Sequence, residues 1–189
     1  MDLLKIVPPQ KESRFDTLLK HAQAEYRLLR VLPKRRSLLM RALYRAALMP
    51  LWNPTFLDDY TTTLFFWVFM PEELIGTDEG YRVLRHELVH VRDAWRTGLL
   101  PFAFSYLFLL PVGLTLRAFW ELRAYTETMR VEFEETGAVA DATIENIAEQ
   151  FTGSAYLWML PFPRWVRRML EERRSAILWR RSYRQTRVD

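Results

Sequence analysis

Two of the three histidines of the chain, His86 and His90, lie four residues apart in the stretch LRHELVHVRD. Residues at this spacing stand one above the other on the same face of an α-helix, so both imidazoles can reach a single ion. Zinc accepts imidazole nitrogen at about 2.0–2.1 Å and prefers four ligands. The pattern therefore indicates half of a zinc site, with an ordinary polar helix face as the alternative interpretation.

Glu87 lies between the two histidines and is turned about 100° around the helix from His86. A carboxylate at that angle is badly placed to bind the same ion, but it is well placed to take a proton from a water molecule bound there. Such a water molecule is a nucleophile at neutral pH that needs no thiol, and the chain contains no cysteine. Glu87 is thus the predicted general base.

A third protein ligand has to come from another part of the chain. Asp93 lies a further turn beyond His90, and one straight helix cannot aim it at the same ion. Glu121, in the segment WELRAYTET, is the better candidate, because two helices joined by an apolar connection can pack antiparallel. Two histidines and one glutamate, with water in the fourth place, make an open catalytic zinc site. The alternative for Glu121 is a surface salt bridge with Arg117 or Arg123.

The segment HELVH, followed after about thirty residues by ELRAY, resembles the zincin metallopeptidases and is closest to their gluzincin arrangement. It is also similar to small uncharacterised bacterial proteins that combine HExxH with an aromatic-rich middle and a Glu-x-x-Ala-Tyr segment. The resemblance covers roughly residues 60–135. It implies a Zn²⁺-dependent peptidase that hydrolyses a peptide or protein substrate. It also implies the ligands His86, His90 and Glu121, with Glu87 as the general base.

The chain departs from the gluzincin pattern at Tyr125, where the downstream motif often carries an acid that orients a ligand histidine. Tyr125 comes one turn after Glu121 and is either a hydrogen-bond donor to an oxyanion or a packing residue. Asp93 or Glu127 could replace the missing acid. The resemblance further implies that TTTLFFWVF, residues 61–69, is an edge strand that pairs with an extended peptide.

The elements that position these residues are mostly helices. Helical periodicity predicts helices over residues 14–32, 35–49, 78–96, 117–136 and 164–181, with a further helix interrupted near Gly153. Residues 60–71 are rich in β-branched and aromatic side chains and predict a strand. Thr77 or Asp78 is the predicted cap of the histidine-bearing helix, and Gly98 its end. We therefore expect a mainly α fold of the α+β class: a zincin-like helical core with an active-site helix, a downstream helix bearing Glu121, and one short edge strand or small sheet.

Charge divides the 189-residue chain into three parts, although its net charge is only +4. Residues 1–50 carry +7 and residues 160–189 carry +6, whereas the stretch between them carries −9. The basic ends either attract the acidic middle or make peripheral contact with an anionic membrane, and nucleic-acid binding is the weakest interpretation. We expect one domain, 1–189, with a basic N-terminal helical arm over 1–50, the zincin-like core over 58–137, and C-terminal helices with a basic tail over 138–189.

Residues 97–116 contain no charged side chain, and a run of this length can span a bilayer. Pro101, Pro111 and Gly113 interrupt the run, so we favour a buried helix and keep membrane contact as the alternative. The N-terminus has no apolar stretch of signal-peptide length. We therefore expect a cytoplasmic address, with membrane association left open. A catalytically inactive zincin-like protein that contacts membranes or other proteins is the alternative function.

Overall fold

The computed structural model describes residues 12–46, 54–107, 112–153 and 159–185. Seven α-helices and a small sheet occupy these residues, which confirms the predicted mainly α fold of the α+β class. The helices are α1 (Arg14–Glu25), α2 (Leu38–Ala46), α4 (Asp78–Thr97), α5 (Leu99–Leu107), α6 (Val112–Thr136), α7 (Asp141–Thr152) and α8 (Pro163–Gln185), with a short 3-10 helix, η1, at Glu72–Leu74.

The sheet has three strands in the order β1 (Arg30–Pro33), β3 (Trp67–Met70) and β2 (Thr62–Leu64). Strand β1 runs parallel to β3, and β2 runs antiparallel to it. Among the described strands, β2 thus forms one edge of the sheet.

Two predicted elements differ from the structure in this region. The helix predicted over 14–32 ends at Glu25, and the last three residues of that range belong to the strand β1. The strand predicted over 60–71 is a hairpin rather than one strand.

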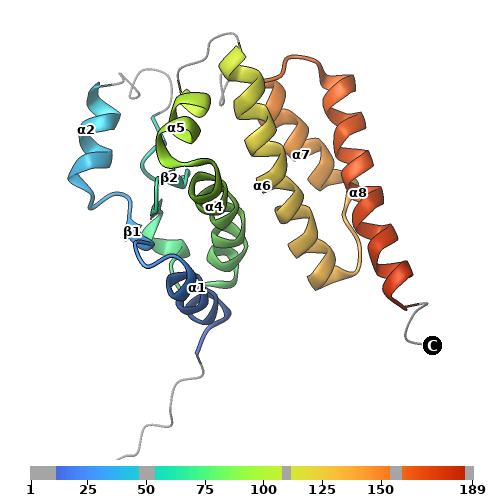
Figure 1. The fold of residues 1–189 in the computed structure, drawn as a ribbon, viewed down its shortest axis with the longest axis horizontal. Helices are drawn as coiled ribbons and strands as arrows, with labels where there is room; N and C mark the ends of the chain where they lie inside the picture. The colour runs from blue at the N-terminus through green and yellow to red at the C-terminus, as the bar shows by residue number, and fades with distance from the viewer. Residues whose placement is uncertain (1–11, 47–53, 108–111, 154–158, 186–189) are drawn as a thin grey trace, which may run out of the picture.

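Helices cover both faces of this sheet, because successive side chains of a strand point to opposite sides. Val68 and Met70 of β3 pack into a cluster with residues of α1 and α4. Phe69 points to the other face, where it packs with Met40 of α2 and with Phe56. The central strand is therefore buried on both sides, and it fixes the position of α4 relative to the sheet (Figure 1).

Helix α4 begins and ends where its sequence predicts. The hydroxyl of Thr77 accepts a hydrogen bond from the backbone N–H of Gly80 at 2.9 Å, so Thr77 is the N-cap. Gly98 follows the last helical residue with a φ of 89°, a conformation that favours glycine. Gly80 is required by space as well, since a Cβ atom there would lie 1.8 Å from the carbonyl oxygen of Leu74. These contacts set the start of α4 against η1.

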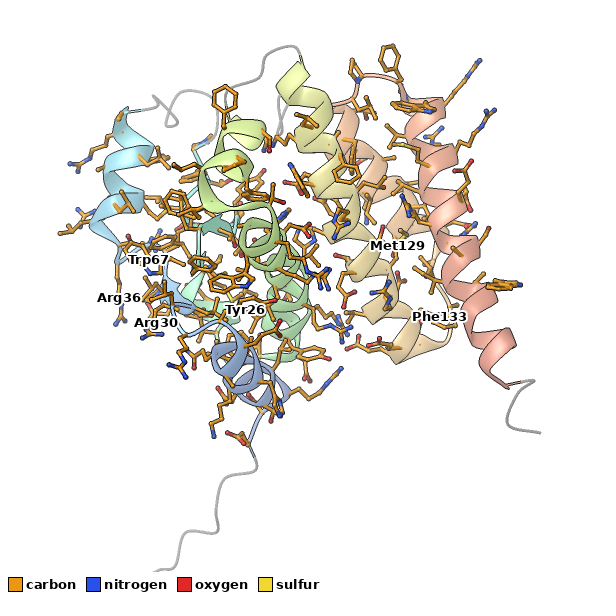
Figure 2. All side chains as sticks on the ribbon, viewed as in Figure 1. Tyr26, Arg30, Arg36, Trp67, Met129 and Phe133 are labelled. Carbon is orange, nitrogen blue, oxygen red and sulfur yellow. The ribbon has the colours of Figure 1, made fainter. Side chains whose placement is uncertain are left out.

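Helix α6 is shared by two layers. One side packs along α4, and another packs with α7 and α8 around a second apolar cluster. Figure 2 shows Met129 and Phe133 of α6 between α6 and α8, and both side chains are buried in that cluster. The helix ends at Gly137, which has a φ of 80°, as its sequence predicts. Helix α6 thus connects the sheet layer to the C-terminal helices.

The uncharged stretch 97–116 forms α5 and the beginning of α6, while residues 108–111 of it lie outside the described part. Phe102 is buried, but Leu100 is 78% exposed and Phe104 is 56% exposed. The expectation of a buried helix is therefore wrong for these two side chains, because α5 packs on α4 and α6 through only one of its faces. Within the described ranges, no helix is both long and apolar enough to cross a membrane.

Candidate metal centre

The structure brings together the three predicted metal ligands. His86 and His90 project from α4 and Glu121 projects from α6, which runs antiparallel beside it (Figure 1). The Nε2 atoms of His86 and His90 lie 3.8 Å and 3.7 Å from Oε2 of Glu121. One ligand atom from each of the three side chains lies within 4.8 Å of the other two. The predicted return of Glu121 to the histidines is therefore confirmed.

These separations fit a shared cation. They are longer than a hydrogen bond and close to the distance of about 3.3 Å between two ligands of a tetrahedral zinc ion. The site is screened from water, since only 5% of His90 and 3% of Glu121 is exposed. Two imidazoles and one carboxylate form a donor set typical of catalytic zinc.

The charges within the triad favour a bound cation. Burial alone would raise the pKa of Glu121, but His90 and His86 outweigh it and hold this pKa well below its ordinary value. Burial alone would lower the pKa of His90, whereas the Glu121 carboxylate raises it above its ordinary value. Glu121 is thus ionised and attracts positive charge. A proton on His90 supplies the same positive charge, so a metal ion has to displace that proton. Metal affinity should therefore decrease as the pH is lowered.

Thr128 orients the ring of His86. The Nδ1 atom of His86 lies 3.0 Å from the Thr128 hydroxyl oxygen, and this hydroxyl donates to the carbonyl of Ala124 at 3.4 Å. When Nδ1–H of His86 donates to Thr128, the Nε2 atom of the neutral ring is the one that can bind a metal ion. A hydroxyl group thus holds the ring of His86 through the nitrogen that faces away from Glu121.

Two ion pairs hold α4 and α6 together on either side of the triad. Arg123 of α6 donates two hydrogen bonds of 2.8 Å to Asp93 of α4, which is 2% exposed. Arg85 of α4 donates to Glu127 of α6 at 2.8 Å. Asp93 and Glu127 therefore fix the helix register instead of orienting a ligand histidine. The proposed salt bridge between Glu121 and Arg123 is replaced by the pairing of Arg123 with Asp93.

Tyr125 packs against the site. Its ring meets that of His86 edge to face, with centroids 4.8 Å apart, and it also contacts the Phe151 ring, with centroids 5.7 Å apart. These contacts support the packing alternative for Tyr125. The ring holds His86 from the side of the C-terminal helices.

Glu87, the predicted general base, lies beside the edge strand. The hydroxyl of Thr63 in β2 donates to Oε2 of Glu87 at 2.6 Å, and only 8% of Glu87 is exposed. The carboxylate is thereby held in one orientation between α4 and the sheet. The strand that the resemblance assigns to peptide binding is thus in direct contact with the candidate base.

Lys34 anchors the segment that leads into this strand. Its side chain is fully buried, and its amino group donates to the carbonyls of Phe56 and Tyr60 at 2.6 Å and 2.7 Å. The same group lies 3.5 Å from the centre of the Phe56 ring. Burial lowers the pKa of Lys34 to about 7, although Glu87 and Asp58 oppose the shift. Lys34 therefore ties β1 to the residues preceding β2.

Sequence reasoning missed three of these supporting residues. Thr128 follows Glu121 by seven residues, so the two lie on the same face of α6, and that spacing was a usable signal. Thr63 is one of three consecutive threonines, and the sequence does not distinguish it from its neighbours. Lys34 begins the basic run KRR, in which nothing marks one residue as buried. No protein-family model, curated protein or solved structure matches the chain, so the candidate centre rests on residue types and geometry.

Proposed function

We propose that this chain is a zinc-dependent peptidase of the zincin type. The single observation that carries the proposal is the convergence of the His86, His90 and Glu121 ligand atoms within 4.8 Å of one another at a nearly closed site. The carboxylate of Glu87, adjacent to His86 on the same helix, supplies the base that a hydrolase of this type needs.

Each residue has a distinct part in the proposed reaction. A zinc ion held by the triad would polarise a peptide carbonyl and increase the acidity of a water molecule beside it. Glu87 takes the proton of the attacking water and passes it to the leaving amine nitrogen. Thr63 keeps the Glu87 carboxylate oriented for both transfers, and Thr128 keeps His86 in the tautomer that binds metal.

Strand β2 gives the proposed substrate a place to bind. It forms an edge of the described sheet, and its Thr63 contacts Glu87. An extended peptide can add to such an edge through backbone hydrogen bonds, which bind peptides with little regard to their side chains. This arrangement supports a peptide or protein substrate.

Metal content is the first test. Protein purified without chelator should contain about one zinc ion per chain, as measured by elemental analysis. His86→Ala and Glu121→Ala should each remove most of it, whereas His21→Ala, an exposed residue of α1 outside the triad, should leave it unchanged. Thr128→Val should weaken zinc binding by about tenfold, since the outer hydrogen bond is lost while the ligands remain. Full zinc content in His86→Ala would contradict the proposed site.

Hydrolysis is the second test. Glu87→Gln should keep zinc but lose cleavage of a mixed peptide substrate, followed by mass spectrometry. Glu79→Gln, an exposed glutamate in the first turn of the same helix, is the matched control and should cleave normally. Zinc binding without any cleavage by the wild type would instead favour the inactive zincin-like alternative. Equal cleavage by Glu87→Gln and the wild type would refute the assigned base.

A further inference from the structure

Acidic residues are absent from three separate segments of the chain. Residues 34–57, 99–120 and 150–170 contain no aspartate or glutamate, although the whole chain has 23. An even distribution would place about eight acids in these segments. The same segments hold nine lysine and arginine residues, at positions 34, 35, 36, 41, 45, 117, 164, 167 and 168. Each segment is thus apolar and basic at once.

Described parts of all three segments lie toward the same end of the molecule. The carboxyl end of α2, the helix α5, and the amino ends of α6 and α8 all lie at the top of Figure 1. We call residues 38–46, 99–107, 112–120 and 159–170, the described parts of these segments, together the acid-free end. Acidic residues gather at the opposite end instead, in the first turn of α4 and the last turns of α6. The three segments thus carry only basic charges, whereas the rest of the chain carries 18 basic and 23 acidic residues.

Large apolar side chains project into solvent from the acid-free end. On α5, Leu100 is 78% exposed and Phe104 is 56% exposed. At the start of α8, Phe162 and Trp165 are 60% and 49% exposed. Leu38, Leu39 and Leu43 are also exposed on α2. Exposed apolar side chains that gather at one end of a molecule favour an interaction surface there.

Arginines accompany these apolar side chains. Arg41 and Arg45 are exposed on α2, and Arg164 and Arg168 are exposed at the start of α8. Arg167 is also exposed but pairs with Glu145 of α7. Guanidinium groups bind lipid phosphates, while leucine, phenylalanine and tryptophan side chains enter the boundary between headgroups and acyl chains. The mixture of the two suits an anionic lipid surface better than a neutral one.

We infer that the acid-free end docks on an anionic lipid bilayer as a peripheral surface. The described helices do not cross a membrane, so the contact is made from one side. The acidic end then faces away from the lipid, which favours a single orientation. Glu121 follows the acid-free segment directly, nine residues into α6, or about 14 Å along the helix. Docking therefore holds the candidate metal centre near the lipid surface, but it does not depend on zinc.

Vesicle binding tests the inference with the full chain. In dilute buffer, the protein should float with vesicles of phosphatidylcholine containing about 30% phosphatidylglycerol, and about tenfold less should float with pure phosphatidylcholine. Added salt should weaken the binding. Absence of binding to the anionic vesicles, or equal binding to both kinds, would overturn the inference.

Substitutions locate the surface. Leu100→Glu combined with Phe104→Glu should reduce binding to the anionic vesicles by about tenfold, because it places two carboxylates on the docking face. Leu28→Glu is the matched control: Leu28 is 62% exposed but lies between α1 and β1, outside the acid-free end, and its variant should bind like the wild type. Circular dichroism checks that each variant is folded. Unchanged binding by a folded Leu100→Glu, Phe104→Glu variant would place the lipid contact elsewhere and refute the assignment.

Discussion

Lys34 offers a prediction that does not depend on the proposed function. Its amino group is buried against two carbonyl oxygens, and its pKa is lowered from 10.5 to about 7. A neutral amine has two N–H donors, which match the carbonyls of Phe56 and Tyr60. The neutral form thus fits the site. Between about pH 7 and 10.5, Lys34 is neutral in the folded chain but still protonated in the unfolded chain, so folding releases a proton.

The sign and size of the effect follow from this difference. Between these pH values the unfolded state binds more protons than the folded state, so the free energy of unfolding rises with pH by about 1.4 kcal/mol per unit. Below pH 7 both states are protonated, and the unfavourable burial of the charge is fully present. From pH 7 to pH 9, Lys34 should therefore add roughly 2 kcal/mol to the stability of the wild type.

Urea unfolding of the wild type and of Lys34→Met measures this effect. Methionine fills similar volume but cannot titrate, so the stability of the wild type relative to the variant should increase by roughly 2 kcal/mol between pH 7 and pH 9. Lys20→Met is the control, because Lys20 is exposed and its pKa is raised by Glu12. A constant difference between wild type and Lys34→Met across this range would show that Lys34 keeps its charge when buried, and the reasoning would fail.

Three further predictions test the surroundings of the site. Arg123→Met should lower the free energy of unfolding by about 2–3 kcal/mol, because it leaves the buried Asp93 carboxylate without its ion pair, and urea unfolding measures this. Thr63→Val should reduce kcat about tenfold while zinc content stays constant, because Glu87 loses its orienting hydrogen bond, so an unchanged kcat would contradict the positioning role. Gly80→Ala should lower stability by roughly 1–3 kcal/mol, since the added methyl group collides with backbone, and an unchanged Tm would speak against that collision.

The candidate metal centre was largely predictable from sequence because its residues follow helix geometry. The spacing of His86 and His90 fixes their common face, and the start and end of α4 are marked by Thr77 and Gly98. The contribution of Glu121 required one inference about packing, that the two helices return antiparallel. That inference was accessible because the connection between them is apolar, with no charged residue over 97–116.

The sheet was harder to predict because its strands depend on partners distant in sequence. Residues 30–33 continue the apolar spacing of the helix predicted before them. Their pairing with β3 makes them a strand instead. Phe65 has a φ of 61°, which is rare for an aromatic residue, so the turn between β2 and β3 lacks the usual glycine or asparagine signal. For the same reason, the burial of Lys34 follows from tertiary packing alone.

The ion pairs Arg85–Glu127 and Arg123–Asp93 determine what should happen to the fold when the metal or one of its ligands is lost. They join α4 to α6 through side chains that are not metal ligands, so we expect the two helices to stay packed when no ion is bound. A chelator should strip the protein reversibly, and returning metal should rebind without refolding. By the same reasoning, a related chain that replaced one of the two histidines should lose the candidate metal centre and keep the fold.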